Sequence, residues 1–282
     1  MTGCAFWVDL LGQKNKGNEM KKLLLVLLFS IILIPSIFAE NSYNNYHPIV
    51  IDGCLLGGSK NNTWINSSAM SQNIKGGEKY KLYSLDKYIG FGIGSQIKYS
   101  DPHKFEMVDI TNVSKDTCVS ISGDWDALLR KPIVQSNNLE VYKNIIKDIL
   151  KQNGLENVPI CIQQNYRIDL DGDGKEEVLI KAEYIKKVAP TSDKGTYSLI
   201  LLRKIINEKV ENILLIKDIF IRNTGFGEKM TTSNTIYSLV DVNGDGIIEI
   251  ILSYKYYEGY LYNLYEIKNN QFKIVLSCGE GA

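Results

Sequence analysis

The chain carries one acidic pattern twice: Asp169-Leu170-Asp171-Gly172-Asp173-Gly174-Lys175-Glu176-Glu177-Val178-Leu179-Ile180 and, 72 residues further on, Asp241-Val242-Asn243-Gly244-Asp245-Gly246-Ile247-Ile248-Glu249-Ile250-Ile251-Leu252. In both copies the acidic stretch leads into an apolar run rich in β-branched residues, which favours a strand. Asp-Gly pairs favour tight turns between strands. The pattern therefore predicts a strand, an acidic loop and another strand, occurring twice.

The two acidic stretches, loop one (169–177) and loop two (241–249), are suited to hold a cation. Oxygens at positions one, three and five converge when the chain curls, and glycine at position six permits the curl. A backbone carbonyl at position seven and a glutamate at position nine complete the set. The expected ligands are Asp169, Asp171, Asp173, the carbonyl of Lys175 and Glu177 in loop one, and Asp241, Asn243, Asp245, the carbonyl of Ile247 and Glu249 in loop two.

An all-oxygen ligand set of this kind favours Ca²⁺ over Mg²⁺, which prefers stricter octahedral sites. Loop one has four carboxylates and loop two has three, because Asn243 is neutral. We therefore expect tighter binding at loop one. The alternative is that the Asp-Gly pairs only make hairpin turns and bind nothing.

An EF-hand is unlike this pattern, since it needs a glutamate at position twelve and helices on both sides. Position twelve is Ile180 in one copy and Leu252 in the other. The pattern D-x-[DN]-G-D-G-x-x-E between strands instead resembles the FG-GAP (VCBS-like) calcium loops of integrin-type β-propellers and of small secreted bacterial proteins of unassigned function. The resemblance covers about Val158–Ala282 and implies blade-like units that bind Ca²⁺. A closed propeller needs at least four blades, so two units imply a partial propeller or sandwich-like packing.

The likeness between the copies continues beyond the loops. Tyr197-Ser198-Leu199 matches Tyr262-Asn263-Leu264, and a hairpin turn follows each, at Asn207-Glu208-Lys209 and at Asn269-Asn270. Each copy therefore predicts strand, acidic loop, strand, strand, strand. Repeats of one such unit pack on each other and share a core. The expected fold is mainly β, with two four-stranded units.

One amphipathic helix is expected ahead of the repeats. Asn138 is its predicted cap and Asn153-Gly154 its end. Its apolar residues recur at helical spacing and predict one stripe that packs on a core, rather than on a membrane surface; they are Leu139, Tyr142, Ile145, Ile146, Ile149 and Leu150. The expected domains are residues 48–135, rich in Gly and Tyr with a short helix at 67–74, and residues 136–282, with 122–137 as a linker.

The N-terminal residues, 1–39, are expected to contain a targeting sequence. Residues 20–39 consist of a basic start, an apolar run and a small residue at the end, which is the order of a secretory signal peptide. Residues 1–19 are expected to be an upstream extension. We therefore expect a secreted or cell-envelope protein, with membrane contact only through an uncleaved leader. The state of Cys54, Cys118, Cys161 and Cys278 stays open between disulfides and isolated buried thiols, because their spacing matches no metal or redox motif.

The amino-acid composition limits the classes of function that this chain can have. The chain has 32 basic and 32 acidic residues, so it offers no footprint for nucleic acid. Its two histidines, His47 and His103, are expected to be exposed rather than catalytic. Trp125 is expected to anchor a loop, with sugar binding as the alternative. Clustered tyrosines suit carbohydrate or protein recognition, with packing within the sheet as the alternative explanation for most of them; they are Tyr254, Tyr256, Tyr257, Tyr260, Tyr262 and Tyr265.

These observations favour a secreted, non-catalytic binding module in which Ca²⁺ is mainly structural and the partner is an extracellular protein or carbohydrate. The alternative is a secreted hydrolase with its active site in residues 48–135.

Overall fold

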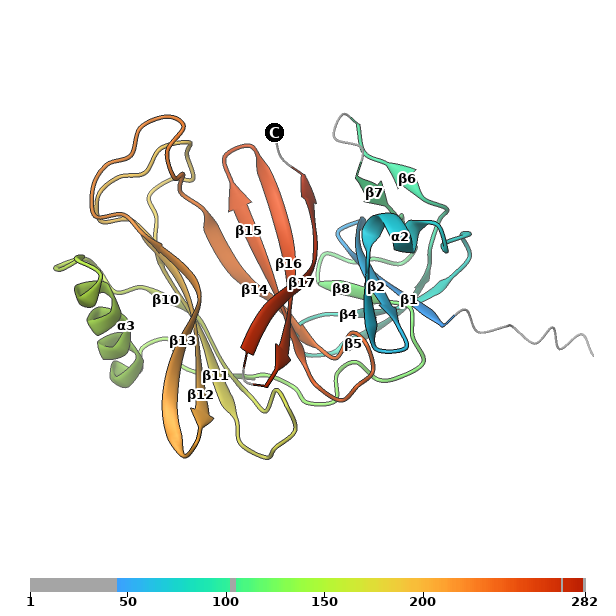
Figure 1. Ribbon diagram of the computed structural model, residues 1–282, viewed down its shortest axis with the longest axis horizontal. Coiled ribbons are helices and arrows are strands. Elements are labelled where there is room, and N and C mark those ends of the chain that lie inside the picture. The colour runs from blue at the N-terminus through green and yellow to red at the C-terminus, as the bar shows by residue number, and fades with distance from the viewer. Residues whose placement is uncertain (1–44, 102–104, 270, 281–282) are drawn as a thin grey trace, which may run out of the picture. The chain divides into compact units, whose positions relative to one another are not determined.

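Antiparallel strands make up most of the regular structure in the computed structural model, which describes residues 45–101, 105–269 and 271–280 (Figure 1). The described part is one compact unit, and the expected leader, 1–39, and His103 lie outside the described residues. The strands are β1 Tyr46–Ile51, β2 Cys54–Lys60, β3 Thr63–Asn66, β4 Lys79–Tyr83, β5 Tyr88–Ile93, β6 Lys98–Tyr99, β7 Glu106–Met107, β8 Val119–Ile121, β9 Ile133–Val134, β10 Ile162–Ile168, β11 Glu177–Tyr184, β12 Tyr197–Ile206, β13 Lys209–Ile219, β14 Ser233–Val240, β15 Glu249–Tyr256, β16 Gly259–Lys268 and β17 Gln271–Glu280. The helices are α2 Ser67–Ser71 and α3 Glu140–Gln152.

The mainly β class and the strand order of the two repeats are confirmed. The first repeat forms a sheet in the order β13-β12-β11-β10-β9, and the second forms a sheet in the order β14-β15-β16-β17. In each repeat four strands that follow one another in the chain are neighbours in the sheet. The first sheet gains β9, in which Val134 pairs with Tyr166 and Ile133 with Arg167. The segment 122–137 is therefore not a plain linker.

The strand register corrects one correspondence between the repeats. Ala182 pairs with Leu199, whereas Tyr254, the residue 72 positions after Ala182, pairs with Leu261. Leu199 therefore corresponds to Leu261 and not to Leu264, three residues further on. The prediction was wrong because Tyr-x-Leu begins β12 but lies three residues into β16, and only pairing with the neighbouring strand fixes the register.

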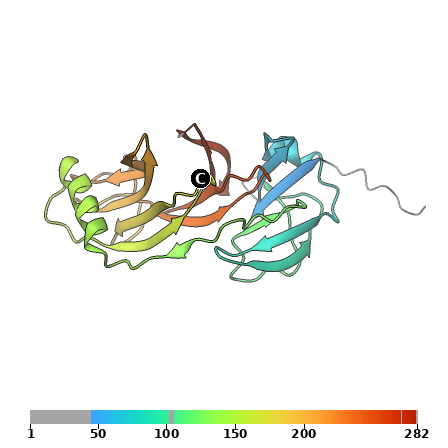
Figure 2. The ribbon, with the colours of Figure 1, turned by 90° about the horizontal axis from the view of Figure 1, so that it is seen from below.

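The sheets are layered, with an apolar core between successive layers. The first core lies between α3 and the sheet of the first repeat, and the second lies between the two repeat sheets. The third core joins the second repeat to the N-terminal sheet, and a fourth lies on the far face of that sheet with Met70 of α2. Figures 1 and 2 show α3 beside the first repeat sheet and the second repeat sheet next to it.

This layering explains why the apolar runs of strands β11 and β15 do not alternate with polar residues. Successive strand residues point to opposite faces, and both faces of β11 and β15 are covered. Leu179 thus enters the second core and Ile180 the first. In the second repeat, Ile250 enters the second core and Ile251 the third.

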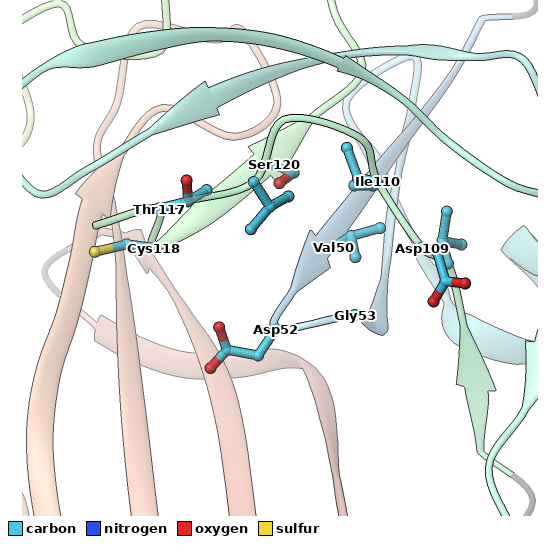
Figure 3. A pocket seen from close by; sticks show the side chains of 10 residues that line it. Val50, Asp52, Gly53, Asp109, Ile110, Thr117, Cys118 and Ser120 are labelled. Carbon is cyan, nitrogen blue, oxygen red and sulfur yellow. The ribbon is translucent and has the colours of Figure 1, made fainter. Parts of the chain in front are cut away.

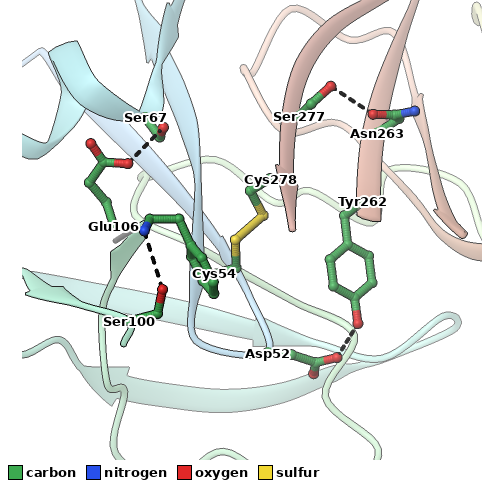
Figure 4. Close-up of a disulfide and its surroundings, with 10 residues drawn as sticks. Asp52, Cys54, Ser67, Ser100, Glu106, Tyr262, Asn263, Ser277 and Cys278 are labelled. Carbon is green, nitrogen blue, oxygen red and sulfur yellow. Dashed lines mark hydrogen bonds between the residues drawn. A yellow bond between two sulfur atoms is a disulfide. The ribbon is translucent and has the colours of Figure 1, made fainter. Parts of the chain in front are cut away.

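The N-terminal sheet has the strand order β5-β4-β8-β1-β2-β7-β6, with β3 paired to β2. The short helix expected at 67–74 is present as α2, and its first turn is capped by the Asn66 side chain, which accepts from the N–H of Ala69. A disulfide joins Cys54 of β2 to Cys278 of β17 (Figure 4). It closes a separation of 224 residues and ties this sheet to the second repeat. Cys118 and Cys161 are free thiols.

Helix α3 packs on the core as expected, with Ile146 and Leu150 buried, and it ends at Asn153 followed by Gly154 at φ +79°. Its start differs from the prediction, because Leu139 is the N-cap and no side chain caps the first turn. The Asn138 N–H instead donates to the Ser136 hydroxyl, so the chain turns before Asn138 can act as a cap. Among the described residues, no helix has the length and apolar character to cross a membrane.

Candidate metal centre

Loop one connects β10 to β11 and loop two connects β14 to β15, and the two loops have the same internal hydrogen bonds. The aspartate at position one accepts two backbone N–H groups across the loop. Asp169 accepts from Gly172 at 2.7 Å and from Gly174 at 3.1 Å. Asp241 accepts from Gly244 at 2.6 Å and from Gly246 at 2.9 Å. These bonds hold the curl that the glycines permit.

The remaining acidic positions also match. At position three Asp171 and Asn243 each accept from the N–H two residues later, and at position five Asp173 and Asp245 do the same with the N–H groups of Lys175 and Ile247. In each of these side chains Oδ1 is the oxygen that accepts. At position nine, each glutamate uses only Oε2 to accept from the loop backbone.

The position-nine glutamates close the loops from the sheet side. Glu177 Oε2 accepts from the N–H of Leu170 at 2.8 Å, and Glu249 Oε2 accepts from the N–H of Val242 at 2.9 Å. Both side chains are buried, at 2% and 0% exposed. Each glutamate therefore keeps Oε1 for another partner inside the protein.

In loop one that partner is Lys204 of β12. Its ammonium donates to Asp171 Oδ2 at 2.6 Å and to Glu177 Oε1 at 2.8 Å. Carboxylate oxygens of Asp169, Asp171 and Glu177 lie within 4.8 Å of one another, which is close enough to share one cation. The ammonium of Lys204, only 3% exposed, already lies against two of these three carboxylates.

The pKa values of Lys204, Asp171 and Glu177 are shifted by burial and by their contacts with one another. Burial alone lowers the pKa of Lys204, but its bonds to Asp171 and Glu177 more than offset this, so the pKa is raised and the ammonium stays charged. Burial raises the pKa of partly exposed Asp171, yet Lys204 outweighs burial and the net direction is down. For Glu177 burial outweighs Lys204, and its pKa is raised.

Loop two lacks such an internal cation. Among the described residues, no Lys, Arg or His forms an ion pair with Asp241, Asp245 or Glu249. Glu249 Oε1 is buried without a hydrogen-bond partner. Burial, with the charges of Asp245 and Asp241, raises the pKa of Glu249 well above its ordinary value, although the Val242 N–H opposes this. A buried carboxylate oxygen without a partner is costly unless a cation or proton compensates it.

Segment 122–137 covers both loops. The indole of Trp125 donates to the carbonyl of Asp241 at 2.8 Å, and a Cβ at Gly244 would come within 2.8 Å of its ring. The expectation that Trp125 anchors a loop is confirmed. Its ring also meets His47 edge-on at 4.9 Å, so His47, expected to be exposed, is instead half-buried and bonded to the carbonyl of Ser122.

Arg130 binds both loops at once. Its guanidinium donates to the carbonyls of Asp169, Leu170 and Gly246, at 2.5, 3.1 and 2.7 Å. The sequence analysis missed Arg130, because no pattern in the residues around it predicts a contact with the loops. It also missed Lys204, although a lysine inside the apolar run 199–206 is itself a signal of a buried charge that needs a partner.

The clustered tyrosines line a groove of about 600 Å³ on β14–β16. Its other walls are mostly hydroxyl-bearing or charged; the lining residues are Asp52, Ser233, Thr235, Ser253, Tyr254, Lys255, Tyr256, Tyr257, Gly259, Tyr260 and Tyr262. Tyr257 is 54% exposed. The Asp52 carboxylate accepts hydrogen bonds from the hydroxyl of Tyr237, at 2.9 Å, and from the hydroxyl of Tyr262 (Figure 4). Tyr262 lines the groove although it is mostly buried in the third core, whereas Tyr265 does not line it and is buried in the second core.

A smaller pocket of about 210 Å³ lies on the N-terminal sheet (Figure 3). Asp52, Asp109, Thr117, Cys118 and Ser120 contribute polar groups, among apolar neighbours. Burial raises the pKa of the Cys118 thiol to about 11, even though a backbone hydrogen bond opposes it. The thiol is therefore protonated at neutral pH, which is the opposite of an activated nucleophile.

No protein-family model, curated protein or solved structure matches this chain, so the assignment of the two loops depends on their own residues and contacts.

Proposed function

We propose that this chain is a secreted or cell-envelope binding module, non-catalytic, whose fold is stabilised by Ca²⁺. The observation that carries the proposal is the buried, unpartnered Oε1 of Glu249 beside loop two. Its neighbours in the loop are Asp241, Asn243 and Asp245, and the pKa of Glu249 is raised by burial and by those two aspartates. A cation bound there converts repulsion among three carboxylates into attraction.

Ca²⁺ is the cation that suits the donors. The residues that would hold it in loop two are Asp241, Asn243, Asp245, Glu249 and the carbonyl of Ile247, all of which offer oxygen. Hard oxygen donors on a flexible loop are the usual environment of Ca²⁺. When bound, the ion supplies positive charge at the corner between β14 and β15 and so adds its binding free energy to the stability of the folded state.

The layered sheets support a structural role for the ion. Each four-stranded repeat packs face to face on the next layer, and we propose that the repeats are blade-like units of a partial propeller or sandwich. Each acidic loop lies at a strand-to-strand corner of its unit. A rigid corner keeps the strands of one unit in register for packing on the next.

The Cys54–Cys278 disulfide supports export. Disulfides form and persist in secreted and periplasmic proteins and are rare in the cytosol. Together with the signal peptide expected at 20–39, this favours secretion or retention in the cell envelope.

The tyrosine-lined groove is the surface that we propose for binding. Aromatic faces offer apolar contact, while Asp52, Ser253 and Lys255 offer hydrogen bonds around them. Carbohydrate fits this mixture best, because a sugar ring presents both C–H faces and hydroxyls. An extracellular protein is the other partner class. The hydrolase alternative, located in residues 48–135, would need the small pocket as its active site, and the protonated Cys118 does not favour it.

Thermal unfolding tests the calcium proposal. The chain from residue 40 onward, which retains the whole compact unit, is melted in excess EDTA and then with added Ca²⁺. Free Ca²⁺ at 100 times Kd should stabilise it by about 2.7 kcal/mol, and Asp241→Ala should abolish the rise. A midpoint that Ca²⁺ leaves unchanged, with no binding in titration, would reject the proposal.

The same preparation tests the groove against a panel of soluble polysaccharides. Tyr257→Ala should weaken binding, whereas Tyr99→Ala, an exposed tyrosine outside the groove, should not. Equal loss in both variants would reject the groove as the binding surface, and binding to a purified extracellular protein alone would identify the other partner class.

A further inference from the structure

We propose that the two loops are not equivalent: the ammonium of Lys204 fills loop one in place of a metal ion, and loop two is the only divalent-cation site in the described part of the chain. The inference rests on the proposed function and deepens it by assigning the ion to one loop. It reverses the order expected from the number of carboxylates, which favoured loop one.

The position of Lys204 in loop one is that of a bound cation. Its Nζ contacts the oxygen of position three at 2.6 Å and that of position nine at 2.8 Å. These are the second oxygens of Asp171 and Glu177, those that the loop backbone does not use. The lysine therefore binds two of the oxygens that a metal ion would need.

Strand register explains why only one repeat has this lysine. Val178 pairs with Arg203, and Ile250 pairs with Tyr265. Continuing each ladder by one residue places Lys204 opposite Glu177, and Glu266 opposite Glu249. Residues directly opposite each other in an antiparallel pair point to the same face. The position that supplies an ammonium in the first repeat thus supplies a carboxylate in the second.

Glu266 does not neutralise loop two. Its Oε1 accepts from the indole N–H of Trp64 at 2.9 Å, a neutral donor on β3. Glu249 Oε1 consequently stays without a partner, whereas its counterpart Glu177 Oε1 has one. At position nine, where both glutamates use Oε2 for the loop backbone, the two loops differ in whether an ammonium binds Oε1.

Binding of a divalent ion in loop one would require the displacement of Lys204. The side chain is 3% exposed, so it would have to leave a buried ion pair or remain beside an ion of like charge. Removing one partner from a buried ion pair costs several kcal/mol because the other charge is left unpaired. Loop two has no such competitor, and its empty state carries the unfavourable charge instead.

Calcium stoichiometry tests the assignment. The chain from residue 40 onward is freed of metal with EDTA, dialysed against Ca²⁺ alone, and its bound Ca²⁺ is counted by elemental analysis and by calorimetric titration. We expect one Ca²⁺ per chain in the wild type, one in Glu177→Gln and none in Glu249→Gln. Lys204→Met should gain a second Ca²⁺, whereas Lys204→Arg, which keeps the charge, should stay at one.

The outcomes separate the two proposals. No bound Ca²⁺ in the wild type or any variant overturns the proposed function, and this assignment with it. Two Ca²⁺ in the wild type overturn only the assignment. So does a wild-type ion that is lost in Glu177→Gln but kept in Glu249→Gln. The glutamine pair retains side-chain shape, so the test stands even if Lys204→Met does not fold, which circular dichroism reports.

Discussion

The two repeats have almost the same loops but different surroundings. Loop one and loop two share five kinds of internal hydrogen bond, from the position-one aspartate to the position-nine glutamate. Arg130 contacts carbonyls of both loops, but only loop one has the ammonium of Lys204 against its carboxylates. Around loop two lies the ring of Trp125, and the neighbouring strand carries Glu266. Local sequence therefore fixes the shape of each loop, while the residues packed on it fix its charge.

The comparison teaches that ligand count alone is a poor guide to metal affinity. Loop one has more carboxylates, but a buried ammonium already compensates two of them. Loop two has fewer, but one of them has an oxygen that nothing compensates. The balance of charge inside the folded protein decides the need for an ion.

The largest expected effect comes from removing the internal cation. In EDTA, Lys204→Met should lower the free energy of unfolding by about 3–5 kcal/mol, because Glu177 and Asp171 lose their buried partner. The matched change in the second repeat, Glu266→Gln, should cost less than about 1 kcal/mol, since its amide oxygen still accepts from Trp64. Urea unfolding measures both. Equal losses would show that the two positions are equivalent after all.

The next effect concerns the covalent tie that only the second repeat has. Replacing Cys54 and Cys278 together by serine should cost about 2–5 kcal/mol. Amides of β17 and β2 should lose protection in hydrogen exchange before those of β11 and β12, which the disulfide does not touch. Cys161→Ser, at a free thiol, is the control. Uniform loss of protection across all three sheets would contradict the prediction.

The smallest effect separates the two glutamates by the size of their pH dependence, because the pKa of Glu177 is raised whereas that of Glu249 is raised well above its ordinary value. Burial raises the pKa of Glu249 above its ordinary value of 4.5, so the folded state holds the proton more tightly than the unfolded state. In EDTA, wild-type stability should therefore fall as pH rises from about 4.5 through the raised pKa, because the unfolded state loses its proton first.

Glu249→Gln removes this penalty. At about pH 8 in EDTA it should raise the free energy of unfolding by about 1–3 kcal/mol, whereas Glu177→Gln should lower it, because the buried ammonium of Lys204 then loses the negative charge of one of its two partners. Urea unfolding at about pH 5 and about pH 8 measures the slope. A stabilising Glu177→Gln, or a destabilising Glu249→Gln in EDTA, would refute the charge difference between the loops.

Much of the fold follows from local pattern. Helix α3 is capped at the predicted Asn153-Gly154, and the four-strand order of each repeat is as expected. The failures involve partners distant in the chain. In strand β2, Gly57 and Gly58 interrupt the apolar pattern, and a Cβ at either would meet backbone oxygen at 2.3 or 2.2 Å. The glycines are needed there for close strand approach.

The candidate site divides in the same way. The sequence by itself determined that both loops curl and present carboxylate oxygens, because glycine placement and aspartate spacing act within nine residues. Only the tertiary structure decided that Lys204 reaches loop one, that Trp125 and Arg130 cover the loops, and that Oε1 of Glu249 is left without a partner. Those facts depend on strand register and on which face of a sheet is buried, and both are set by contacts between segments far apart in the chain.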